Sequence, residues 1–74
     1  MTRLRYERMR REWTQVELAQ RAHIDPALLS RIETGRVLPY APALERLARA
    51  FGMAPGDAPQ LIEEIVPPSL QTTR

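Results

Sequence analysis

The sequence predicts an all-α fold of five short helices, and three observations support it. Apolar residues recur at three- and four-residue steps, residues that begin or end helices separate these segments, and no alternating strand pattern occurs in the chain. With 74 residues and no cysteine, the chain can build one small hydrophobic core without disulfides. We therefore expect one compact domain held together by helix packing.

The first two helices follow each other closely. Strong helix formers, several of them arginines, predict a helix from Leu4 to about Arg11. Thr14 and Glu17 have the spacing of a capping box, in which each side chain accepts a hydrogen bond from the other residue's backbone N–H. A second helix should therefore begin after Thr14 and end near Ala22.

The third helix has a clear start and end. Asp25 is a good N-cap, and Pro26 suits the first helical position, where no N–H is needed. Gly35 is placed to end this helix, and two prolines predict a loop over residues 36–42.

Two further helices complete the domain. The fourth carries an apolar stripe and is ended by Gly52, and a short fifth helix over residues 61–66 is ended by two prolines. Residues 1–66 should form the domain and residues 67–74 a flexible tail, because the tail offers almost nothing to bury. The stripe of the fourth helix consists of Leu44, Leu47, Ala48 and Phe51. The predicted core comprises Trp13, Leu18, Ala19, Ala22, Ile24, Leu29, Ile32, Leu47 and Phe51.

The formal net charge of +2 is unevenly distributed. Residues 1–36 contain eight arginines and five acidic residues, whereas residues 37–74 contain three and four. The first half is therefore the candidate surface for an anionic partner, although solvated helix faces produce the same composition. The carboxylates are expected to be surface charge. Four arginines in or next to the first helix could add a diffuse basic field, but most of them are expected to be solvated: Arg3, Arg5, Arg10 and Arg11.

Several classes of protein are excluded by composition and pattern. No apolar segment is long enough to cross a membrane and no secretory signal follows the first residues, so we expect a soluble, cytoplasmic protein without a membrane partner. The single histidine and the two serines lie in no catalytic motif, and no glycine-rich phosphate loop occurs. We therefore expect no enzyme activity, no metal site and no cofactor.

Two short helices joined by a few residues are typical of a helix-turn-helix, whose second helix enters the DNA major groove. Over about residues 4–53 the chain resembles the Cro/C1-type (Xre-like) helix-turn-helix repressors. This resemblance implies a lambda-repressor-like DNA-binding domain whose helix-turn-helix is formed by the second and third helices. The matching motifs are Trp13-Thr14-Gln15, Glu17-Leu18-Ala19, Ile24-Asp25-Pro26, Leu29-Ser30-Arg31-Ile32-Glu33, Gly35-Arg36, Pro39 and Leu44-Glu45-Arg46-Leu47-Ala48.

The resemblance implies a set of phosphate contacts. Gln15 holds the place of a phosphate-binding glutamine, and Arg8 and Glu33 match a pair that locks the first helix against the third. The pair is equally compatible with a purely structural role, as Tyr40 is with loop packing. The expected phosphate contacts are Gln15, Thr14, Arg8, Thr34, Arg36 and Tyr40.

Base reading is expected from exposed positions of the third helix. Arg31 is the foremost candidate because its guanidinium can donate two hydrogen bonds to guanine, although it could instead hold a phosphate. Pro26 and Ala27 depart from the hydrogen-bonding residues common in the family, so contact with thymine methyl groups and readout of DNA shape gain weight. The expected base contacts are Arg31, Ala27, Ser30, Leu28 and Pro26.

His23 lies in the turn where the family commonly has glycine. A left-handed backbone there is tolerable for histidine, and an exposed turn residue is the expected role, ahead of a metal-binding or pH-sensing one.

These features predict a sequence-specific double-stranded DNA-binding transcriptional regulator. We expect a homodimeric repressor on operator DNA, with the third helix, about residues 25–34, in the major groove. The expected dimer interface is Leu61, Ile62, Ile65, Val66 and Leu70, side chains that could equally close the core of one chain. The alternatives are an antitoxin, a restriction-modification controller protein, and a protein-interaction module that has lost DNA binding; a toxin or RNA polymerase is a candidate protein partner.

Overall fold

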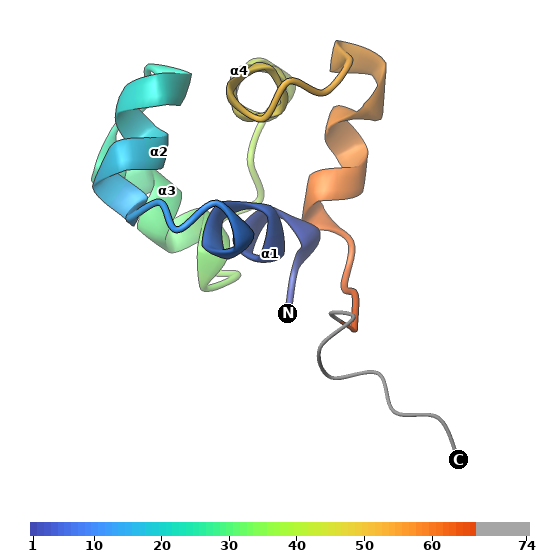
Figure 1. Ribbon diagram of the computed structural model, residues 1–74. Coiled ribbons are helices and arrows are strands. Elements are labelled where there is room, and N and C mark those ends of the chain that lie inside the picture. Colours follow the sequence, from blue (N-terminus) through green and yellow to red (C-terminus); the bar gives the residue numbers. More distant parts are fainter. Residues whose placement is uncertain (67–74) are drawn as a thin grey trace.

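The computed structural model describes residues 1–66, which contain five helices and no strand (Figure 1). The helices are α1 (Arg3–Arg10), α2 (Gln15–Ala22), α3 (Pro26–Glu33), α4 (Ala41–Ala50) and the 3-10 helix η1 (Pro55–Ile62). The predicted all-α fold is confirmed. None of these helices has the length and apolar character needed to cross a bilayer.

The helices enclose one core. In Figure 1, α1 lies below α4, with α2 and α3 on one side and η1 on the other. α4 packs against α2 and η1, while α2 also packs against α3. Trp13 and Ile24 are only half-buried against the core, whereas the other predicted core side chains are buried. The buried apolar residues are Leu4, Leu18, Ala19, Ala22, Leu29, Ile32, Ala43, Leu44, Leu47, Ala48, Phe51, Ala58 and Leu61.

The predicted helix starts of α2 and α3 are present as hydrogen bonds. Thr14 Oγ1 accepts from the Glu17 N–H at 3.1 Å, and Glu17 Oε1 accepts from the Thr14 N–H at 2.8 Å. Asp25 Oδ1 accepts from the Ala27 N–H at 2.8 Å, with Pro26 as the first residue of α3. Because both caps satisfy amides that have no partner within the helix, they determine where α2 and α3 begin.

The helix ends also follow the prediction. His23 follows α2 with a left-handed backbone (φ 59°), and Gly35 and Gly52 follow α3 and α4 with φ near 77° and 78°. The same conformation costs a histidine more than a glycine because of its Cβ. The Ile24 N–H donates to the Ala19 carbonyl at 3.0 Å, which closes the end of α2.

The fifth helix differs from the prediction. η1 begins at Pro55 and ends at Ile62, so Ile65 and Val66 lie outside it. Pro59, inside η1, has no N–H to donate to the preceding turn, which disfavours a regular α-helix there. η1 therefore includes Pro55, Gly56 and Pro59, residues that precede the predicted fifth helix.

The chain after η1 is extended and joins the N-terminus. The Glu63 carbonyl accepts from the Arg3 N–H at 2.9 Å, and the Ile65 N–H donates to the Met1 carbonyl at 2.8 Å. These bonds hold residues 63–65 beside the first residues and explain why Ile65 and Val66 do not continue a helix. The flexible tail predicted for residues 67–74, including Leu70, lies outside the described residues.

Two charged residues expected at the surface belong to the fold instead. Glu7 is 5% exposed, and its Oε1 accepts from Arg11 Nη1 at 2.6 Å. Arg11 Nη2 donates to the Phe51 carbonyl at the end of α4, and the guanidinium lies 4.8 Å from the centre of the Phe51 ring. That ring stacks on Trp13 at 5.9 Å. The expectation of a surface carboxylate was wrong for Glu7, and the bond from Arg11 to Phe51 could not be expected because the two residues are 40 positions apart.

The burial of Leu61 yields a test of the core. Leu61 is 0% exposed and Ile62 is 42% exposed, although they are neighbours in η1. Leu61→Ala should lower the free energy of unfolding by about 2–5 kcal/mol. Ile62→Ala should lower it by less than ~1 kcal/mol, because much of its side chain stays in water. Urea denaturation measures both, and equal losses would contradict this placement of η1.

Candidate nucleic-acid interface

α2 and α3 form a helix-turn-helix. Each has eight residues, and only residues 23–25 separate them. Leu18 and Ala19 from α2 and Leu29 from α3 are fully buried, so the two helices pack through the core. The left-handed turn at His23 and the Asp25 cap set the direction in which α3 leaves that turn.

The predicted base contacts on α3 differ in their exposure to solvent. Pro26, Ala27 and Arg31 are exposed, whereas Leu28 and Ser30 are only partly accessible. Leu28 packs against the core, so much of its side chain faces inward. The three exposed residues therefore define the flank of α3 that a ligand can reach.

A carboxylate at the end of α3 joins the first three helices. Glu33 Oε2 accepts from Arg8 Nε at 2.7 Å, and Glu33 Oε1 accepts from Arg8 Nη2 at 2.9 Å. Oε1 also accepts from Gln15 Nε2 at 3.0 Å. The Glu33 side chain is 3% exposed and the Arg8 side chain 12%. This bidentate, nearly dry pair fixes α1 and the start of α2 against α3.

The Glu33 carboxylate binds both Gln15 and Arg8, but the two side chains differ in the hydrogen-bond donors that they leave for a ligand. Arg8 also donates from Nη1 to the Trp13 carbonyl at 2.8 Å, so three of its donor atoms are used inside the protein. Gln15 gives one N–H to Glu33 and keeps a second at the partly positive start of α2. The link between Gln15 and Glu33 was missed because nothing in their sequence spacing indicates it.

The other predicted phosphate contacts border α3. Thr14 Oγ1 accepts within the capping box, which leaves its O–H to donate. Thr34 Oγ1 instead donates to the carbonyls of Ser30 and Arg31 at 3.0 and 3.2 Å, so its hydroxyl proton is already engaged. Arg36 is exposed, and the Tyr40 residue is 60% exposed.

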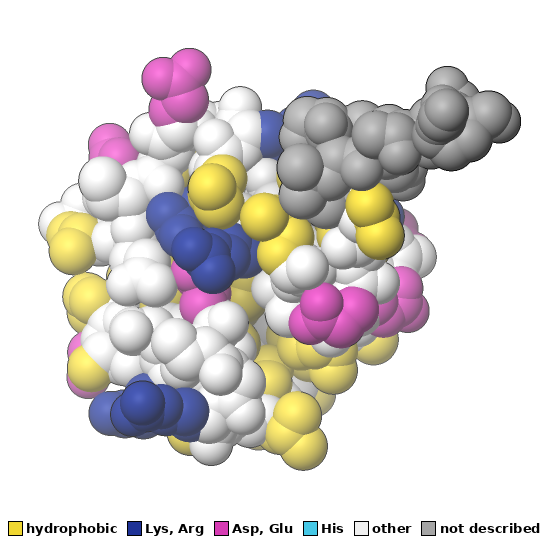
Figure 2. Space-filling model, turned by 90° about the horizontal axis from the view of Figure 1, so that it is seen from below, with side chains coloured by type: hydrophobic (Ala, Val, Ile, Leu, Met, Phe, Trp, Pro, Cys, Tyr) yellow, Lys and Arg dark blue, Asp and Glu magenta, His cyan; other side chains and the backbone are white. Residues whose placement is uncertain are grey.

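The arginines of the described residues fall into two classes. Arg3, Arg8, Arg10 and Arg11 form ion pairs with Glu7 or Glu33. Within residues 1–66 no carboxylate lies within ion-pair distance of Arg5, Arg21, Arg31, Arg36, Arg46 or Arg49. Figure 2, which views the side of α1, shows arginines in separate groups rather than as one continuous basic surface. Binding of an anionic partner therefore depends more on individual unpaired arginines than on the total charge of the protein.

The site contains no arrangement suited to a metal ion. Among residues 1–66, no three histidine, aspartate or glutamate side chains gather closely enough to hold one. The donors along α3 and its borders are guanidinium, amide, hydroxyl and phenol groups, which suit an anion rather than a cation.

Comparison with known proteins agrees with this geometry. A family model described as a helix-turn-helix domain matches residues 2–61, which include all four α-helices and most of η1. No curated protein and no solved structure matches the chain significantly. The match spans more than half of the chain, and the capped α2 and α3 with the three-residue turn lie inside it. The chain therefore belongs to the helix-turn-helix domain family, of the Cro/C1/Xre-like type.

Proposed function

We propose that this protein is a sequence-specific transcriptional regulator that represses by occupying operator DNA with α3 in the major groove. Membership of the helix-turn-helix family indicates DNA binding, and such domains are typically not enzymes. The proposal rests on the contrast between the buried and the exposed side of α3. Leu29 and Ile32 are in the core, while Ala27 and Arg31 are exposed on a helix whose far end is fixed by Glu33.

Arg31 is assigned to base reading. Its exposed side chain makes no hydrogen bond or ion pair within residues 1–66, so its guanidinium is available to guanine O6 and N7. The Ala27 methyl and the Pro26 ring add apolar contacts at the start of α3, where a thymine methyl is the matching group. Leu28 and Ser30 contribute only from the edge of this surface, because both are half-buried.

Phosphate contacts are assigned to both borders of α3. Gln15 lies at the start of α2, with its amide oriented by Glu33 and with the dipole of α2 behind it. Arg36 follows α3 in the chain and has no carboxylate partner within residues 1–66. Thr14 and Tyr40 add weaker donors. Arg8 contributes mainly by fixing α1 against α3 through its ion pair with Glu33. Such contacts orient a duplex without reading its sequence.

Substitution of two arginines separates the two kinds of contact. Arg31→Ala should cost about 1–3 kcal/mol of binding to a selected duplex and should relax the preference at one base pair. Arg36→Ala should weaken selected and random duplexes alike and reduce the salt dependence of binding, because it removes one phosphate contact.

The measurement selects duplexes from a random pool and then titrates each variant by fluorescence anisotropy. A uniform loss for Arg31→Ala would move this residue from base reading to phosphate binding. If no duplex binds even at low salt, the protein is an interaction module rather than a regulator that binds DNA itself.

A homodimer would let two copies of α3 read two half-sites about 34 Å apart. Leu61 is withdrawn from the predicted interface because its side chain is completely buried within one chain. Ile62 and Val66 remain, at 42% and 58% exposed, with Ile65 partly accessible beside them. Leu38, 85% exposed, lines an apolar hollow of about 160 Å³ together with Ile62 and extends this surface toward the loop after α3.

A charge placed on this surface tests the dimer. Ile62→Glu should shift sedimentation from dimer toward monomer and lower duplex affinity by about tenfold or more, while the helix content is unchanged. Met9→Glu is the matched control, because Met9 is similarly exposed, at 46%, on α1. A wild-type protein that sediments as a monomer both alone and on DNA would rule out the dimer.

A further inference from the structure

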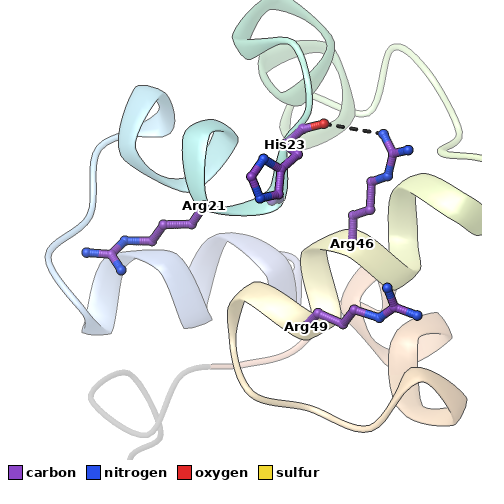
Figure 3. A pocket seen from close by; sticks show the side chains of 5 residues that line it. Arg21, His23, Arg46 and Arg49 are labelled. Carbon is purple, nitrogen blue, oxygen red and sulfur yellow. Dashed lines mark hydrogen bonds between the residues drawn. The ribbon is translucent and has the colours of Figure 1, made fainter.

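A second group of arginines lies outside the set of assigned DNA contacts. Arg21 and His23 at the end of α2 and Arg46 and Arg49 of α4 line an open hollow of about 430 Å³ (Figure 3). Ala22, which is 1% exposed, contributes to the floor. The assigned DNA contacts include none of these residues.

The positive charge of this hollow is not neutralised by the part of the chain that the structure describes. Arg21, Arg46 and Arg49 have no carboxylate within ion-pair distance there, although four arginines among residues 3–11 pair with Glu7 or Glu33. Arg21 and Arg49 lie in the last turns of α2 and α4, where a cation interacts favourably with the helix dipole. That effect does not account for Arg46, which lies in the middle of α4.

Two of these side chains are held in position. Arg46 Nη1 donates to the His23 carbonyl at 3.3 Å, so its guanidinium reaches from α4 to the end of α2. The Arg21 guanidinium lies 4.2 Å from the centre of the Trp13 ring. Partly ordered arginines lose less conformational entropy when a ligand binds them.

The arrangement suits a ligand with several separated negative charges. Figure 3 shows that the Arg21 side chain extends away from Arg46 and Arg49, and that the last two point in different directions. A single small oxyanion cannot contact guanidinium groups that diverge in this way. Ala22 and the methylene stems of the arginines form an apolar floor between the charges. A polypeptide that carries spaced carboxylates matches both features.

The composition of the hollow favours a polypeptide over the duplex held by α3. A sugar-phosphate backbone is contacted mainly through polar groups and would leave the apolar floor unmatched. Arg46 and Arg49 belong to α4, whereas the base-reading flank belongs to α3. We propose that the hollow between α2 and α4 is a docking site for an acidic segment of a partner protein, which binds there while α3 holds DNA.

The single tryptophan provides a direct readout. A glutamate-rich peptide without tryptophan, titrated into the full chain, should change the fluorescence of Trp13, because the carboxylates of the bound peptide change the electrostatic field around the arginine that covers its ring. A peptide with glutamine at every glutamate position should bind at least about tenfold more weakly, because it lacks the charges that pair with the arginines.

Two double variants of equal charge locate the site. Arg46→Gln with Arg49→Gln should lower peptide affinity by about tenfold and leave duplex affinity unchanged. Arg31→Gln with Arg36→Gln removes the same charge and should do the reverse. In the unmodified chain, the peptide should shift backbone amide resonances at Ala22, His23, Arg46 and Arg49, which keeps the test independent of how the variants fold.

Three results would overturn the proposal: equal binding of both peptides, equal loss of peptide affinity in both double variants, or resonance shifts centred on α3. Displacement of the peptide by inorganic phosphate at constant ionic strength would also contradict it, since the hollow would then be a site for a small oxyanion. Loss of duplex binding alone would count against the proposed function and not against this site.

Discussion

The carboxylate of Glu33 is the constraint on which the candidate interface depends. It lies at the end of α3, is almost inaccessible to water, and accepts hydrogen bonds from Arg8 on α1 and from Gln15 on α2. Burying a charge pair adds little net stability, since the desolvation of both ions offsets their attraction, but removing one partner costs about 3–5 kcal/mol. The group is therefore best understood as a device for orientation. It fixes the helix that faces the ligand relative to the amide and guanidinium groups at its border.

The second structural theme is the division of the arginines between internal and external roles. Glu7 and Arg11 link α1 to the end of α4, where the guanidinium meets both the Phe51 carbonyl and the Phe51 ring. These internal uses explain how a protein with a net charge of only +2 can present a few strongly cationic positions. Arg31 and Arg36 border the candidate DNA surface, and the unpaired arginines of α2 and α4 form a separate surface. The total charge is therefore a poor guide to where an anion can bind, whereas the pairing of each arginine identifies the guanidinium groups that are available.

The sequence was most informative where structure is determined locally. The capping box at Thr14, the Asp25-Pro26 start of α3 and the glycine ends of α3 and α4 depend on residues within a few positions of one another. It was least informative where partners are far apart. The bond from Arg11 to Phe51 joins residues 40 positions apart. The spacing of apolar residues did not predict that η1 would include Pro59, and it left open whether Leu61 closes the core or forms a dimer interface. The Arg8–Glu33 pair is intermediate, because only the family resemblance suggested it before the structure showed its geometry.

Chemical-shift mapping of the ¹⁵N-labelled protein with duplex DNA at low ionic strength tests the central claim most directly, because it reports on every part of the domain at once. If Glu33 orients α3 and its borders for a duplex, the largest changes should lie at Gln15, Ala27, Arg31 and Arg36, with small changes on α4 and η1. Changes concentrated on α4 or η1, or no change at any duplex concentration, would contradict the account.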